Sequence, residues 1–389
     1  MPIATPAVTL RRLTAIVFVQ WMGATLGLPL LALFFVHRGG SPRLIGLIVA
    51  SFFISGLATQ FFMGRLADIY GRRRVLVSGL ILYGVSSMTY LLPLHAAWFT
   101  MTRVVQGGCA GAIEVASMSA VAALFSEHER GTAVSRIMAA ALLGMAVGPM
   151  AGVVVTVNTL QWAFFASGVA SLIAAVIAAK TPLGDVADDE APLPPVRWTG
   201  QLVGALVAAA AVGLVIGVYE TCWSMLMHAH HATQLEIRLS WTLFCLPWVA
   251  LSKAGGWIAD HSNRKVAASL GVCNAAIFLS IYPHIHNNVV LLFIGSLESI
   301  GASLTMPSTS SLLSQGSHDR EFGRRQGLST TAQTATLAFS ALISGYLFSR
   351  NTALPFTTMA IAAGTMGIAT AWLWRHTQGY VRATSPSDS

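Results

Sequence analysis

Charged residues are scarce in this sequence. Only 10% of its 389 residues are charged, whereas 54% are hydrophobic and the mean hydropathy is +0.66. Ordinary soluble domains contain about 25% charged residues and a smaller apolar share. The composition therefore excludes a typical water-soluble domain and indicates a protein that lies in a lipid bilayer.

Cysteines and catalytic signatures are also few. The four cysteines all fall in apolar stretches without a C-x-x-C pair, so we expect buried thiols and no disulfide framework. There is no P-loop and no G-x-S-x-G, and the H-E-x-x-H pattern that begins at His128 fails because Thr132 fills its last position. A self-powered pump and a membrane enzyme, the main rival class, are disfavoured, and no cofactor is expected.

Long apolar runs fill most of the chain. About twenty consecutive apolar residues form a helix that crosses a bilayer, and internal Gly and Pro are tolerated in such helices. We predict an all-α membrane protein with twelve transmembrane helices at residues 14–36, 43–63, 75–94, 97–124, 133–157, 161–180, 199–226, 237–258, 266–284, 289–313, 328–348 and 355–374.

The basic residues sort by alternate loops between these runs. The side that both termini share carries 17 of the 23 Lys and Arg residues. Cytoplasmic loops of membrane proteins are enriched in this way, so both termini are predicted to be cytoplasmic in a multi-pass plasma (cell inner) membrane protein. The enrichment of basic residues in cytoplasmic loops then explains the net charge of +8, and no nucleic acid partner is expected.

The stretch TPLGDVADDEAPLPPVR, rich in proline and acid, separates two groups of six runs. This composition is typical of an exposed linker. We predict four segments: an N-terminal six-helix half at 1–180, a cytoplasmic linker at 181–198, a C-terminal six-helix half at 199–376 and a cytoplasmic tail at 377–389.

The two halves echo each other in sequence. GRLADIYGRRRV from Gly64 recurs as GWIADHSNRKVA from Gly256, and GAIEVASMS from Gly111 faces GASLTMPST from Gly301. Two echoes at nearly one offset indicate a duplicated six-helix unit, as in many secondary transporters. In the first echo Gly71 faces Asn263, and since both residue types readily adopt left-handed turns, a turn is expected at each.

The first of these loops carries a family resemblance. Its sequence resembles the signature G-x-L-A-D-x-x-G-R-[RK] of the major facilitator superfamily, and the twelve runs in a 6+6 division extend the resemblance over nearly the whole chain. The resemblance implies that Asp68 latches the inner gate by bonding to arginine and to the N-terminus of the eleventh helix, where the helix dipole favours negative charge. The implied gating residues are Gly64, Asp68, Gly71, Arg72 and Arg73, with a weaker copy at Asp260 and Arg264.

Two further motifs narrow the resemblance. RVVQGGCAG matches the superfamily's R-x-x-x-G signature at Arg103, Gln106 and Gly107. GMAVGPMAG resembles the G-x-x-x-G-P-x-x-G motif of the drug:proton antiporters, which implies conformational roles for Gly144, Gly148, Pro149 and Gly152. The same spacing of small residues is also how any two membrane helices pack closely, so a purely structural interpretation stays open.

Ionisable residues inside apolar runs are costly and usually functional, and we single out four of them: Arg103, Glu114, Glu220 and Glu298. Arg103 either faces the cavity beside a proton-relay group or snorkels to the outer headgroups. Glu298 either exchanges protons between access states or stays hydrogen-bonded to Ser296 or Ser299. The proton-coupling candidates are Arg103, Glu114 and Glu298.

The first apolar run contains no acidic residue, which puts proton coupling through that helix in doubt. Its strongly polar group is Gln20. An aromatic side chain such as Trp21 either lines a cavity or marks a membrane interface. The substrate-binding candidates are Gln20, Trp21, Gln106, Tyr219 and Glu220.

Five histidines, which follow the seventh and ninth runs, could sense external pH. They have no Cys or acidic partner at ligand spacing, so no metal site is predicted: His228, His230, His231, His284 and His286.

These observations, together with the resemblance, predict a secondary active transporter. The favoured function is proton-coupled antiport, with multidrug efflux of small amphipathic compounds by rocker-switch alternating access. The alternative is a proton-coupled importer or facilitator of a sugar, organic acid or other small metabolite. The expected partners are the small-molecule substrate, protons and the lipid bilayer, and the protein is expected to be monomeric.

Overall fold

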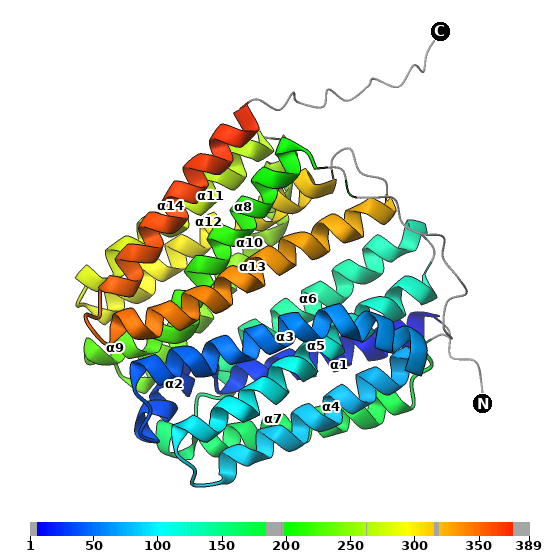
Figure 1. Cartoon of the computed structure of the whole chain (residues 1–389), viewed down its shortest axis with the longest axis horizontal. Helices are drawn as coiled ribbons and strands as arrows, with labels where there is room; N and C mark the ends of the chain where they lie inside the picture. Colours follow the sequence, from blue (N-terminus) through cyan, green and yellow to red (C-terminus); the bar gives the residue numbers. More distant parts are fainter. Residues whose placement is uncertain are drawn as a thin grey trace.

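The computed structural model describes residues 6–125, 127–183, 196, 198–261, 263–314 and 319–375. These residues form an all-α fold, as predicted (Figure 1). The helices are α1 (Pro6–Leu26), α2 (Leu28–His37), α3 (Pro42–Tyr70), α4 (Arg72–Met88), α5 (Phe99–Leu124), α6 (Glu127–Ala151), α7 (Leu160–Ala179), α8 (Gly200–Val218), α9 (Ser224–Ala229), α10 (Gln234–His261), α11 (Arg264–Ile281), α12 (Asn288–Ser314), α13 (Asp319–Phe348) and α14 (Leu354–Arg375).

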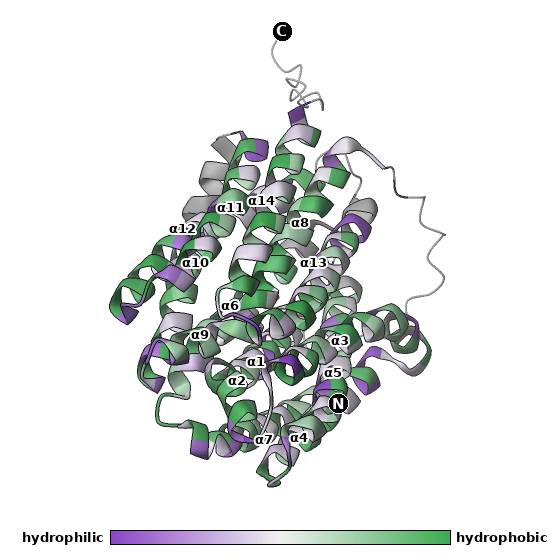
Figure 2. Cartoon of the chain, turned by 60° about the vertical axis from the view of Figure 1, so that its left-hand side comes forward, coloured by the Kyte–Doolittle hydropathy of each residue, from purple (hydrophilic) through white to green (hydrophobic). Residues whose placement is uncertain are grey.

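The helices are long and apolar enough to cross a membrane. Ten spans among the described residues meet both criteria. α10 and α13, 28 and 30 residues long, occupy the other two predicted positions. Apolar residues predominate along the helices (Figure 2), and many large apolar side chains are exposed, as expected where helices contact lipid rather than water.

Two spans depart from a continuous α-helix. The first divides at Gly27 into α1 and α2, where Pro29 lacks a backbone N–H and the Leu30 amide bonds to the Gly27 carbonyl at 3.2 Å. The seventh contains a π-helical turn, Tyr219–Trp223, between α8 and α9. The sequence predicts neither irregularity. Single π turns in α-helices are frequent at functional sites.

The same helix pairs form in both parts of the chain. In the first part α1 packs on α6, α3 on α5 and α4 on α7. In the second part α8 packs on α13, α10 on α12 and α11 on α14. We call these groups the first bundle (α1–α7) and the second bundle (α8–α14). The proposed linker at 181–198 lies mostly outside the described residues, as does the whole tail at 377–389.

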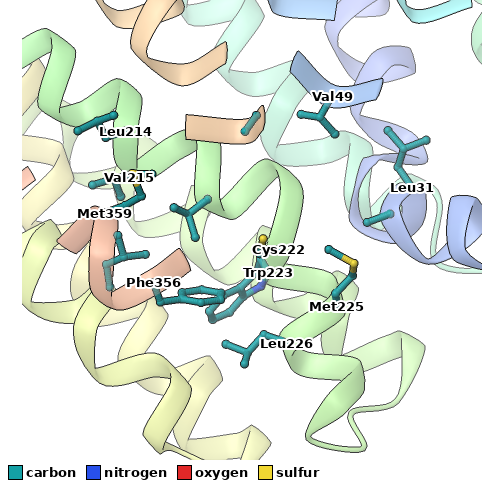
Figure 3. Packing of buried hydrophobic residues seen from close by; sticks show 14 of the residues in the cluster. Leu31, Val49, Leu214, Val215, Cys222, Trp223, Met225, Leu226, Phe356 and Met359 are labelled. Carbon is teal, nitrogen blue, oxygen red and sulfur yellow. The ribbon is translucent and has the colours of Figure 1, made fainter. Parts of the chain in front are cut away.

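In the described part of the chain, the bundles share a buried apolar core at one end. We call the end where α7 stops and α8 begins the linker end, and the opposite end the far end (Figure 1). One buried cluster runs through the second bundle and joins the far end of the first, with Leu31 and Val49 on one side and Met225 on the other (Figure 3). A separate cluster around Leu13 and Ala116 belongs to the first bundle alone.

Candidate transport site

Among the residues that the structure describes, polar contacts between the bundles lie at the far end. The Ser224 hydroxyl donates to the Pro29 carbonyl at 2.6 Å, and Arg43 Nε donates to the Ser349 hydroxyl at 3.1 Å. The Val157 amide donates to the side-chain oxygen of Gln234 at 3.0 Å. Together with the shared apolar cluster, these contacts close the far end of the space between the bundles.

Arg238 of α10 forms the most buried of these contacts. Its side chain is 1% exposed, and its guanidinium donates to the carbonyl oxygens of Val155 at 2.6 Å and Leu26 at 3.3 Å. Leu26 ends α1 and Val155 follows α6, so the cation lies where two helix C-termini converge, a position that helix dipoles favour. An arginine inside the predicted span 237–258 is a signal that sequence reasoning could have used.

Glu298 lies in the middle of α12 and is 2% exposed. Its two carboxylate oxygens accept hydrogen bonds from the Tyr219 hydroxyl at 2.8 Å and the Tyr282 hydroxyl at 2.6 Å. The predicted hydrogen bond between Glu298 and Ser296 or Ser299 is wrong, because both serine hydroxyls donate to backbone carbonyls of their own helix. Tyr219 and Glu298 were both predicted and meet here, whereas nothing in the sequence connects Tyr282 to Glu298.

Arg103 is buried near the far end of α5 rather than snorkelling to the surface. It is 7% exposed, its guanidinium lies 4.6 Å from the centre of the Phe52 ring, and it donates to Gln106 Oε1 at 3.4 Å. Gln106 in turn donates to the Ser87 hydroxyl at 2.9 Å. The guanidinium is therefore held by an aromatic face and an amide.

Glu220 lies on the π turn of the second bundle and interacts electrostatically with Arg103 of the first bundle. A π turn inserts one extra residue into the helical repeat and so changes which side chains share a face. This pair brings two of the four predicted intramembrane charges toward each other. They carry opposite signs and belong to different bundles.

The other candidates lie apart from these groups. Glu114 is exposed and accepts a hydrogen bond from Gln60 Nε2 at 3.0 Å, and no described contact joins it to Arg103 or Glu298. Gln20 is 8% exposed, and its buried side-chain oxygen has no hydrogen-bond partner among the described residues. Trp21 is 39% exposed on the same helix.

The G-x-x-x-G-P-x-x-G stretch packs α6 against α1. A Cβ atom at Gly144 would lie 2.7 Å from the Phe18 carbonyl oxygen, and one at Gly148 would lie 2.7 Å from that of Met22. A Cβ atom at Gly152 would meet both Leu26 and the Arg238 guanidinium. Pro149 lies within α6 near its C-terminus. The motif thus brings α6 onto α1 and leaves room for Arg238 beside both.

The two loop motifs differ at their turns. Gly71 has φ of +89° and is the one residue between α3 and α4, as expected. Asn263 has φ of −73°, so its predicted left-handed turn is wrong. Its side chain instead caps α11 by accepting from the Lys265 amide at 3.1 Å.

Within the first loop Arg72 is buried and Arg73 is exposed. Arg264 is the first residue of α11. Gly64 and the side chains of Asp68 and Asp260 lie outside what the structure describes, so the predicted latch stays a prediction.

Two of the five histidines meet at the far end of the second bundle. The rings of His230 and His286 stack with centroids 4.8 Å apart. Burial lowers the pKa of His230, and the nearby charges of His286 and His231 lower it further. No group of three or more His, Cys, Asp or Glu side chains with metal-binding geometry occurs among the described residues.

Sequence comparison places this chain beside known transporters. The Major Facilitator Superfamily matches residues 13–219 and again 201–388. Multidrug resistance protein 2 of Bacillus subtilis is 25% identical over 362 residues, which cover 87% of this chain and 88% of that protein. Drug efflux pump JefA of Mycobacterium tuberculosis is 34% identical over 167 residues, 42% of this chain and 32% of that protein.

Solved structures agree with the sequence comparison. The D-xylose-proton symporter superposes with a TM-score of 0.78 at 16% identity, covering 96% of this chain and 98% of that one. The nucleoside transporter NupG superposes with a TM-score of 0.75 at 11% identity, covering 94% and 99%. Such low identities show a common fold alone. With both comparisons in agreement, the chain belongs to the Major Facilitator Superfamily and is a multi-pass membrane transporter rather than an enzyme.

Proposed function

We propose that this protein exports small amphipathic compounds in exchange for protons. The observation that carries the proposal is the buried carboxyl group of Glu298, which bonds to two tyrosine hydroxyls and to no cation among the described residues. A carboxyl group whose access to water changes between two conformations is neutral in one and charged in the other. Proton transfer is thereby coupled to the conformational change.

Alternating access supplies the conformational change. The closed far end and the separate apolar cores toward the linker end correspond to one of two states, and rocking of the bundles produces the other. The loop motif acts as the gate of the linker end, through Asp68, Arg72, Arg73 and their copies Asp260 and Arg264. Both termini are cytoplasmic in this proposal, so the substrate enters from the cytoplasm.

The substrate site lies between the bundles. Glu220 offers an acceptor to a cationic group, Gln20 and Gln106 offer amides, and Trp21 and Tyr219 offer flat apolar faces. The names of two relatives, a multidrug resistance protein and a drug efflux pump, support export of such compounds. The protein works as a monomer in this proposal, and proton-coupled import of a sugar or organic acid is the alternative function.

Transport into vesicles of defined orientation tests the proposal. With an imposed pH gradient, the wild-type protein should accumulate a lipophilic cation against its gradient. Glu298→Gln should reduce this accumulation roughly tenfold or more, in the range of coupling free energies between sites, while substrate exchange without a gradient persists. Glu236→Gln, at a carboxylate in the first turn of α10 that accepts a hydrogen bond from the Thr233 hydroxyl, serves as the matched control. If Glu298→Gln leaves gradient-driven accumulation unchanged, Glu298 is not in the proton path.

The direction of transport separates the two functions. Substrate movement opposite to the proton flux supports the exporter, and movement with the protons supports the importer. A protein that accumulates no compound from a broad panel under either gradient would overturn both.

A further inference from the structure

A groove of about 480 Å³ runs along the outside of the first bundle, where α3 and α4 each pack against α5 but contact each other little. We call it the α4 groove. Small residues of α4 and α5, including Gly79, Gly108 and Ala112, line its floor and leave the space open. Leu82 and Val105, which are 54% and 43% exposed, stand at its sides.

The α4 groove faces the bilayer. Its α4 and α5 residues belong to membrane spans at Arg72–Leu91 and Ala96–Val121. From Arg74 to Leu82 the groove follows eight residues of helix, which corresponds to about 12 Å. An apolar channel of this length, open along its side to lipid, fits an acyl chain better than a polar solute.

The linker end of the α4 groove is cationic. Arg74 is exposed there, and its guanidinium makes no hydrogen bond or ion pair with another described residue. The groove lining includes the phenol of Tyr70 and no acidic side chain among the described residues. Arginine binds phosphate oxygens through paired N–H donors, and basic residues at the membrane surface attract anionic lipids.

The apolar channel and the arginine belong to one continuous surface. We infer that the α4 groove binds an anionic phospholipid of the surrounding bilayer, with one acyl chain between α3 and α4 and the phosphate on Arg74. Both parts of the ligand are needed, because the channel recognises a chain and the guanidinium recognises the charge. This inference is independent of the proposed substrate and of proton coupling.

Native mass spectrometry of the intact protein in mild detergent tests this site with phosphatidylglycerol and phosphatidylcholine. The wild-type protein should bind phosphatidylglycerol more tightly. Arg74→Gln should weaken phosphatidylglycerol binding about tenfold, as expected for a lost charge-assisted hydrogen bond, and leave phosphatidylcholine binding unchanged. Ser78→Leu, which fills the groove from an exposed position on α4, should weaken binding of both lipids.

Matched controls lie elsewhere on the surface. Arg375→Gln removes an exposed arginine at the linker end of α14, and Thr365→Leu introduces a leucine at an exposed position of that helix. Both should bind lipid as the wild-type protein does, and thermal unfolding should verify that every variant is folded. Wild-type lipid binding by Arg74→Gln and Ser78→Leu would overturn the inference. Equal competition by glycerol phosphate, which has no acyl chain, would overturn it as well.

Discussion

The helix pairs α1–α6 and α8–α13 occupy equivalent places in the two bundles. The glycines that allow close contact lie on the second helix of the first pair but on the first helix of the second pair. In the first pair the glycines lie on α6, as at Gly148. In the second pair they lie on α8, where a Cβ atom at Gly217 would be 2.5 Å from the Leu337 carbonyl oxygen, and the Ser340 hydroxyl of α13 donates to the Leu214 carbonyl. The fold requires the two helices to approach closely, but either helix of the pair can carry the glycines that allow it.

The same lesson applies to charge. α5 and α12 are equivalent by the sequence repeat, and each buries one ionisable side chain. The residue is a cation, Arg103, in the first bundle and an anion, Glu298, in the second. Their partners differ as well, since Arg103 faces a phenylalanine ring whereas Glu298 accepts from two tyrosines. The two bundles thus share an architecture, but equivalent helices bury side chains of opposite charge.

The comparison of the two helix pairs is tested most strongly by replacing a glycine at each close contact with a larger residue. Gly148→Val and Gly213→Val should each destabilise the protein by about 1–3 kcal/mol or more, because each added side chain meets the neighbouring helix. Thermal unfolding in detergent measures the effect. Gly327→Val on α13 is the control, since a Cβ atom there meets nothing within 4 Å. An equal loss at all three positions would assign the effect to helix propensity alone.

The next largest effect concerns Arg238, which ties the α1–α6 pair to the second bundle. Arg238→Met keeps an unbranched apolar stem but removes the guanidinium and its hydrogen bonds to Leu26 and Val155; a hydrogen bond from a charged donor is worth about 1.5–3 kcal/mol. The far-end contact should therefore open more often. Reactivity of a cysteine introduced at Pro29, labelled from the far side in intact vesicles, should rise. Unchanged labelling would show that the apolar cluster alone closes this end.

A smaller effect is expected at Tyr282. Tyr282→Phe removes one of two hydrogen bonds to Glu298, worth about 1.5–3 kcal/mol when the carboxylate is charged. The pH at which gradient-driven transport is half-maximal should shift, while the transport maximum changes little. Tyr346→Phe, a tyrosine at the far end of α13, is the control. No shift in the pH profile would place Tyr282 outside the proton path.

The smallest effect concerns the stacked histidines. Because the pKa of His230 is lowered in the folded protein, the unfolded chain binds the proton more readily, and stability should fall as the pH drops below about 6.5. His286→Gln removes one of the charges that lower this pKa, so the pH dependence should become shallower. Thermal unfolding between pH 8 and pH 5 measures the slope; an equal slope in both proteins would contradict this account.

The sequence predicts the helices well because twenty-residue apolar runs have few alternatives in a membrane. The position of Arg103 and its neighbour Gln106 follows from a motif on one helix. The meeting of Tyr282 with Glu298 does not, since it depends on how α11 and α12 rotate against each other. The π turn at Glu220 is also invisible in a hydropathy pattern, because it changes the register of a helix without interrupting its apolar run.

The single residue between α3 and α4 has a mechanical consequence. Gly71 is the one residue between the two helices, so a displacement of the linker end of α3 also displaces the adjoining end of α4. α3 packs against α13 of the other bundle, whereas α4 packs on α5 and α7 and exposes Ile81, Leu82 and Val85 on its outer side. In the proposed alternating-access cycle, motion at the centre of the molecule reaches its lipid boundary through this connection, and lateral pressure from the bilayer acts back on the proposed gate.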